Sequence, residues 1–239
     1  MTLLEIGVIH LIKVENVDVW GFESAIRGMR NPLNSWDKSD SDCITCCLER
    51  KDADCANCKL YIGPADLKLM KNLARAGSDH AKYLRMINVS MDIIAPLFWW
   101  KEFDTYKVGT VANSCSTMHK IMDRDFTVDD FSWDTITKFN NGYIEVMLQM
   151  LNQFRDLYVN YDDYKTQDII LDEVIKKDIW RILIETLPSS YNQRRTVQMN
   201  YQVCWNMYQA RQDHKLDEWR QLCTQFEALP YFADIFLDY

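Results

Sequence analysis

Glycine and proline are scarce in this sequence, with seven glycines and five prolines among 239 residues. Folds built from many short strands and tight turns use both residues heavily, because glycine and proline supply the backbone conformations that turns require. The scarcity argues against a turn-rich all-β fold. It favours a mainly helical protein.

Long apolar runs and basic clusters are also missing. No stretch reaches the ~18 to 20 apolar residues of a membrane span. The first residues lack the basic segment and the small-residue cleavage site of a secretory signal. The net charge is −8, and no basic stripe is present of the kind that binds a nucleic-acid backbone. We therefore expect a cytoplasmic protein that binds neither a membrane nor a nucleic-acid polymer.

Common catalytic motifs are absent too. The sequence contains no glycine-rich phosphate loop and no Gly-x-Ser-x-Gly elbow. Its four histidines show no i, i+4 pair of the kind that binds a metal on a helix. Any site must therefore be inferred from less familiar patterns.

The secondary-structure pattern predicts a small sheet among helices. The clearest strand is INVSMDII at 87–94, in which apolar and polar residues alternate. A second strand is expected over 4–17, followed by a short helix that Asp18 caps and that runs through Met29. Helical spacing predicts a helix that ends before Gly77, one that starts at Pro96, and helices in most of the remaining chain. Without repeats or linkers, we expect a single domain over 1–239, with a cysteine-rich insertion at about 37–62.

Five cysteines lie within that insertion. Two Cys-x-x-Cys pairs suit a tetrahedral zinc ion, because each pair can bind along one edge of it. The spacer between the pairs is shorter than in common zinc ribbons, so free or redox-linked thiols on a surface loop are the alternative. The zinc interpretation predicts a structural site formed by Cys43, Cys46 or Cys47, Cys55 and Cys58.

The segment TYKVGTVANSCSTMH, residues 105–119, concentrates polar side chains after a dense apolar run. One interpretation is that it lines a site for a polar ligand. The other is that Asn113, Ser114 and Ser116 cap a helix running to Met122. The two are compatible, since a helix N-terminus also binds anions.

A second polar pattern lies in NYQVCWNMYQAR, where Asn200, Asn206 and Arg211 are spaced by six and then five residues. On one helix, Asn200 and Arg211 would lie about three turns apart on nearly the same side, with Asn206 rotated away. A single small ligand could not contact all three. Across a subunit boundary, however, one helix can serve two ligands.

This run, with HKLDEW after it, resembles the helix near the end of flavin-dependent thymidylate synthases. The resemblance implies that Asn200 and Asn206 contact flavin and that Arg211 holds the pyrimidine of deoxyuridylate (dUMP). The family has a further arginine two residues after the first asparagine, where this sequence has Gln202. His80 resembles the family's histidine before the central strand and would also contact the cofactor.

Residues 101–119 fall where the family has its signature. There an Arg-Gln precedes an Arg-His-Arg triplet, followed by Asn-Glu, Ser and Arg-Tyr. This sequence has in those places Lys101-Glu102, Thr105-Tyr106-Lys107, Asn113-Ser114, Ser116 and Met118-His119, with one extra residue in between.

The resemblance carries roles onto these positions. It implies catalytic roles for Ser116 and Lys107 and flavin contact for Tyr106. It implies nucleotide contacts for Lys101, Glu102, Lys107, Asn113, Ser114, Ser116 and Arg211. It also implies FAD as cofactor, a homotetramer with active sites between subunits, and an α/β (α+β) fold that is mainly helical around a small sheet.

The signature is eroded, however, because other residues stand at its arginine positions. In the family these arginines neutralise phosphate and stabilise charge on the activated pyrimidine, and a bidentate guanidinium is poorly replaced by an uncharged side chain. We therefore expect a nucleotide-binding protein with weakened or lost catalysis, for example one that sequesters a small nucleotide. The alternatives are an active flavin-dependent methyltransferase that converts dUMP to dTMP, and a non-catalytic structural oligomer.

Overall fold

The structure is a computed structural model that describes residues 11–43, 60–133, 135, 141–167, 169 and 173–237. The chain divides into two compact units. Unit 1 comprises the described residues of 1–13, 93–105 and 113–196. Unit 2 comprises those of 14–92, 106–112 and 197–239. The strands β4, β5 and β6 each contribute residues to both units. The expectation of a single domain stays a prediction.

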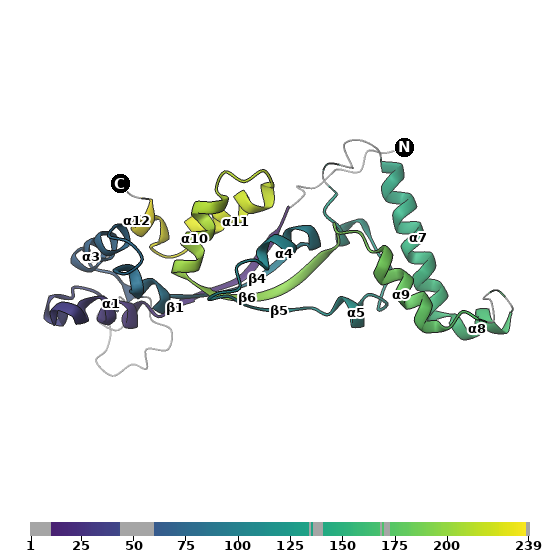
Figure 1. Ribbon diagram of the computed structural model, residues 1–239, viewed down its shortest axis with the longest axis horizontal. Helices are drawn as coiled ribbons and strands as arrows, with labels where there is room; N and C mark the ends of the chain where they lie inside the picture. Colours follow the sequence, from purple (N-terminus) through teal and green to yellow (C-terminus); the bar gives the residue numbers. More distant parts are fainter. Residues whose placement is uncertain are drawn as a thin grey trace. The chain divides into compact units, whose positions relative to one another are not determined.

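A four-stranded antiparallel sheet runs through the fold in the order β1-β4-β6-β5 (Figure 1). Its strands are β1 (Lys13–Trp20), β4 (Asn88–Pro96), β5 (Val111–Ser114) and β6 (Asn192–Asn200). In β4, Val89, Met91 and Ile93 are buried, whereas Asn88 on the other face is partly exposed. The alternation of the sequence therefore predicted this strand and its buried face correctly.

The strand β6 was not expected, because the sequence around 196–200 was interpreted as the start of a helix. Val197 and Met199 are both buried and their neighbours face the other way, as strand periodicity requires. These residues form a strand because β6 lies between β4 and β5 in the sheet and pairs with both of them. The helix α10 (Tyr201–Arg211) begins only after Asn200.

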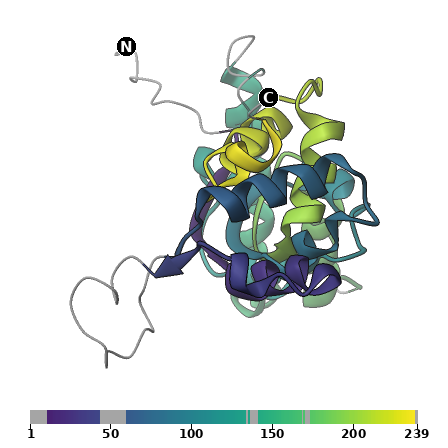
Figure 2. The same cartoon turned by 90° about the vertical axis from the view of Figure 1, so that its left-hand side faces the viewer.

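Unit 2 also holds the helices α1 (Phe22–Arg30), α3 (Pro64–Arg75), α11 (Asp217–Glu227) and α12 (Phe232–Phe236). Figure 2 shows α3 between α1 and α12, and it contacts both helices. Short 3₁₀ helices are η1 (Asn31–Leu33), η2 (Trp36–Lys38) and η3 (Ala81–Met86). The core of the unit is rich in aromatic side chains, including Trp219, Phe226 and Phe232, which are fully buried.

Two helix boundaries in unit 2 test the sequence analysis. The helix α3 ends at Arg75 and is followed by Gly77, whose φ is 103°, so this prediction is confirmed. The proposed cap at Asp18 is wrong, because Asp18 is an exposed residue of β1. The helix α1 starts instead after Gly21, which has a φ of 98°. At this position an added Cβ would lie 2.0 Å from the carbonyl oxygen of Met86, so the junction requires glycine.

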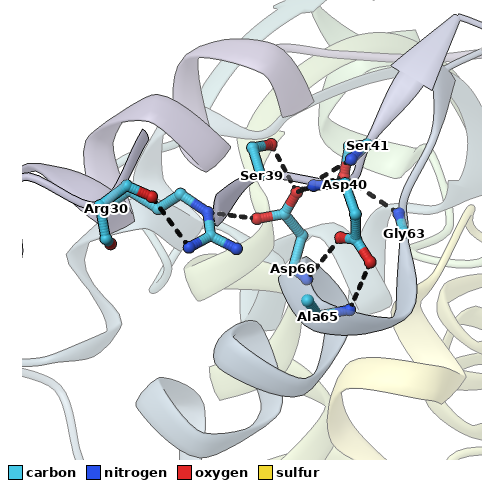
Figure 3. A network of polar contacts seen from close by, with 8 residues as sticks. Arg30, Ser39, Asp40, Ser41, Gly63, Ala65 and Asp66 are labelled. Atoms are coloured by element: carbon cyan, nitrogen blue, oxygen red, sulfur yellow. Dashed lines mark hydrogen bonds and ion pairs between the residues drawn. The ribbon is translucent and has the colours of Figure 1, made fainter. Parts of the chain in front are cut away.

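A short hairpin stem and a buried carboxylate lie at the start of α3. The strands β2 (Asp42–Cys43) and β3 (Leu60–Tyr61) are antiparallel, with Cys43 opposite Leu60. Beside them, Asp66 accepts hydrogen bonds from the Ser39 and Ser41 hydroxyls at 2.7 Å each and pairs with Arg30 Nε at 2.6 Å (Figure 3). The network joins the segment before the stem to the first turn of α3.

Unit 1 is built around the helices that follow β4. They are α4 (Leu97–Phe103), α5 (Thr117–Lys120), α7 (Asn141–Val159), α8 (Tyr161–Thr166) and α9 (Lys176–Thr186), with the 3₁₀ helix η4 (Val128–Asp130). α7 and α9 run alongside each other (Figure 1). They share a buried cluster that includes Phe131, stacked on Trp133 at 4.3 Å, with Leu151 and Leu183. Over the described residues, no helix is long and apolar enough to cross a membrane.

Candidate functional site

The segment after α4 forms one wall of a pocket in unit 2. A cavity of about 400 Å³ is lined by the segment residues Lys107, Gly109, Thr110 and Val111, together with Asn88 of β4 and Gln198 and Met199 of β6. Residues with amide, hydroxyl and ammonium groups thus line one pocket. Such a set can bind a polar ligand that carries negative charge.

Gly109 allows this segment to lie close to the first turn of α10. Its φ is +80°, and a Cβ there would come 3.0 Å from Val203 Cγ2 and 3.4 Å from Asn200 Nδ2. A side chain at this position would therefore be strained and would also push against the helix. The glycine fixes how near Lys107 and Thr110 come to α10.

Two polar atoms near the start of α10 stand out. Within the described part of the chain, Thr110 Oγ1 and Gln202 Oε1 are buried and have no hydrogen-bond partner. Such atoms are rare in folded proteins, because leaving them unpaired is costly. Thr110 is also one of the residues that line the pocket. The amide of Gln202 donates to Asn206 Oδ1 at 3.0 Å.

Arg211 lies at the end of α10 among aromatic rings. Its Nε donates a hydrogen bond to the Tyr106 hydroxyl at 2.9 Å. Its guanidinium carbon lies 4.6 Å from the centre of a Trp219 ring and 5.6 Å from that of Tyr106. The structure thus joins Tyr106 and Arg211, which the sequence analysis had assigned to different ligands. Neither assignment is tested by these contacts.

The two asparagines of this run have different environments. Asn200 is the N-cap of α10, and its Oδ1 accepts a hydrogen bond from the Val203 amide at 3.1 Å. Asn206 lies on the exposed side and accepts from Gln202. The expected buried side of the helix, which includes Cys204 and Met207, is confirmed.

The remaining predicted residues lie in several elements. In unit 1, Lys101 and Glu102 belong to α4 and Asn113 and Ser114 to the edge strand β5. Ser116 is the N-cap of α5 but, in the part of the chain that is described, its side chain makes no capping hydrogen bond. Of the three residues that could have capped a helix running to Met122, only Ser116 lies at a helix start, and that helix ends at Lys120. Pairing of Cys115 N with Arg194 O at 2.9 Å keeps this stretch beside β6.

His80 and the cysteine cluster complete the set of predicted ligands. His80 lies exposed in unit 2, in the turn before η3. Cys43 belongs to β2, whereas Cys46, Cys47, Cys55 and Cys58 lie outside the described residues. Among the residues that are described, no three His, Cys, Asp or Glu side chains are grouped as metal ligands. The zinc site stays a prediction from the sequence.

Buried cysteines offer no nucleophile here. Burial raises the pKa of the Cys223 thiol to about 12, and the nearby Glu227 acts in the same direction. Burial also raises the pKa of Cys204 far above its usual range. Both thiols are neutral at pH 7, and a neutral thiol is a poor nucleophile.

Sequence reasoning missed three polar residues that line the pocket. Asn88 had been assigned to the polar face of its strand, but without a role. Thr110 lay within the polar segment and was not singled out. Gln198 was hidden by the incorrect helix prediction; the alternation Val197, Gln198, Met199 was the available signal.

No family model and no curated protein matches the sequence. Among solved structures, a flavin-dependent thymidylate synthase from Helicobacter pylori in complex with FAD and dUMP aligns with a TM-score of 0.64 at 16% identity, covering 94% of this chain and 99% of that one. A second structure of this synthase with FAD and dUMP gives 0.63 at 14%, covering 94% and 98%. The chain therefore has the fold of flavin-dependent thymidylate synthases.

Proposed function

We propose that the chain binds a small nucleotide in the pocket of unit 2, and that synthase-type catalysis is weakened or lost. The observation that carries the proposal is the position of Lys107. Lys107 lines one pocket together with the polar residues Asn88, Thr110 and Gln198. A lysine can neutralise a phosphate, while amides and a hydroxyl can hydrogen-bond to a sugar or a base.

The shared fold supports the choice of ligand class. The aligned synthases hold FAD and dUMP in their solved structures. We extend nucleotide binding, with FAD as a second candidate ligand, to this chain as a proposal. Weakened catalysis follows from the chain's own residues, because Thr105 and Met118 stand where the resemblance has arginines. Neither side chain can stabilise negative charge as a guanidinium does.

Calorimetric titration with dUMP and, separately, with FAD tests the proposal. We expect Lys107→Gln to weaken nucleotide binding about ten- to a hundred-fold, because it removes a charged hydrogen bond worth roughly 1.5–3 kcal/mol. Lys107→Arg should retain most of the affinity. Lys68→Gln, which removes an exposed charge from α3, is the matched control and should bind as the unaltered protein does.

Two further measurements separate binding from catalysis. Mass spectrometry of small molecules released from the purified protein should detect a nucleotide, and a flavin would also give visible absorption. Tritium release from labelled dUMP, with FAD, reduced nicotinamide and methylene-folate supplied, should be far below that of an active synthase. Robust release would contradict the loss of catalysis. Equal affinity in Lys107→Gln would contradict the assigned pocket.

A further inference from the structure

The segment 106–110 is held against α10 at two separated places. Near the start of the helix, Gly109 lies against Asn200 and Val203. At the end of the helix, the Tyr106 hydroxyl accepts the hydrogen bond from Arg211. Lys107 lies between these two points and lines the pocket. Its position therefore depends on both attachments.

Several contacts hold Tyr106 in place. The Tyr106 ring meets the Trp219 ring edge-on, with centroids 5.8 Å apart, and Trp219 is fully buried in α11. The Arg211 guanidinium lies over the Trp219 ring and within reach of the Tyr106 ring. Cation–π contact and the hydrogen bond thus act on the same two side chains. Together they give Tyr106 a defined position against α10 and α11.

Arg211 is not among the described residues that line the pocket. Its Nε is engaged by Tyr106 and one face of its guanidinium lies against Trp219. An arginine that recognised the ligand directly would instead point the N–H groups of its guanidinium toward the cavity. The contacts observed in this chain point to an indirect role.

We infer that Arg211 is a positioning residue, which acts through Tyr106 to place Lys107 and Thr110 at the pocket. The effect on ligand affinity rests on the proposed function. The role of Arg211 in holding the segment 106–110 does not depend on it. Loss of the Tyr106 attachment should release the segment at one end, while Gly109 remains against α10. The ligand would then meet a mobile Lys107, and ordering that residue would reduce affinity.

Two variants remove the attachment in different ways. Tyr106→Phe removes the hydroxyl and keeps the ring, whereas Arg211→Lys keeps the charge and removes the planar guanidinium. Arg27→Lys, at an exposed arginine of α1, is the matched control. Limited trypsin digestion of the unliganded protein measures the mobility of the segment through the rate of cleavage after Lys107. Cleavage after Lys68 in α3 serves as the internal reference.

We expect both variants to raise the cleavage ratio several-fold and to weaken dUMP binding about tenfold, with melting temperatures close to that of the unaltered protein. The double variant should be little worse than either single variant, because both act through one contact. Arg27→Lys should change neither quantity.

Other outcomes would overturn the inference. If Arg211→Lys weakened binding while Tyr106→Phe did not, Arg211 would contact the ligand itself. If neither variant changed the cleavage ratio, the contact would not position the segment. Should the unaltered protein fail to bind dUMP, the proposed function would be in error for that ligand, and the cleavage ratios would still decide the role of Arg211.

Discussion

Asp66 is a carboxylate with no exposed surface, and it depends on its neighbours to remain charged. Burial alone raises its pKa, but hydrogen bonds from Ser39 and Ser41 and the charge of Arg30 outweigh that effect and hold the pKa below its usual value. Arg30 is itself 5% exposed, so each member of the pair needs the other. Removing one partner would leave a buried charge uncompensated.

We predict that Asp66→Asn lowers the free energy of unfolding by about 3 kcal/mol at pH 7, at the lower end of the cost of breaking a buried pair. Urea unfolding measures the change. Asp37→Asn, at an exposed position in η2, is the control and should have little effect. A loss below about 0.5 kcal/mol would mean that the pair adds no net stability.

The same residue predicts a pH dependence. Because the folded pKa of Asp66 lies below the unfolded value of about 3.9, its contribution is complete above that pH and is lost as the pH falls through the folded pKa. The difference in stability between the unaltered protein and Asp66→Asn should therefore narrow below about pH 4. A constant difference down to pH 3 would show that protonation of Asp66 is not involved.

At the scale of elements, the junction between β1 and α1 depends on Gly21. We predict that Gly21→Ala destabilises the protein by more than the roughly 1–2 kcal/mol of left-handed strain, because the new Cβ would also collide with the Met86 carbonyl oxygen. Gly77→Ala is a matched control, with a φ of +103° but no atom within 4 Å of an added Cβ. Thermal unfolding of both variants separates strain from collision. If the two variants lost equal amounts of stability, the collision of the new Cβ at position 21 with the Met86 carbonyl oxygen would add nothing to the strain.

At the scale of the whole molecule, association of several copies remains a proposal. Val108 is 92% exposed and lies in sequence between two residues that line the proposed pocket, and Val111, which lines it, is 70% exposed. Exposed apolar side chains at such a place are suited to contact with another chain. We predict that light scattering gives a mass of at least two chains, each of 28.3 kDa.

A single charge at this surface tests the contact. Val108→Asp should shift the mass toward that of one chain, because an unpaired carboxylate is costly in an apolar interface. Val128→Asp, at a half-exposed position in η4, is the control and should leave the mass unchanged. A monomeric unaltered protein would contradict the proposal.

The sequence by itself determined the elements whose signal is local. Alternation in INVSMDII predicted β4, and helical spacing with a terminal glycine predicted α3. Both signals arise from periodic burial within a few neighbouring residues. The resemblance in the last third and around 101–119 then predicted the fold that the aligned synthase structures share.

Only the tertiary structure decided what depends on distant partners. Residues 196–200 form a strand because β4 and β5 offer pairing on both sides, although the following residues continue as a helix. Tyr106 and Arg211 are 105 positions apart in sequence, and no local pattern indicates their hydrogen bond. Gln198 and Asn88 likewise reach the pocket through strand pairing. Propensity and periodicity describe neighbours along the chain, whereas strand pairing and side-chain contact are set by neighbours in space.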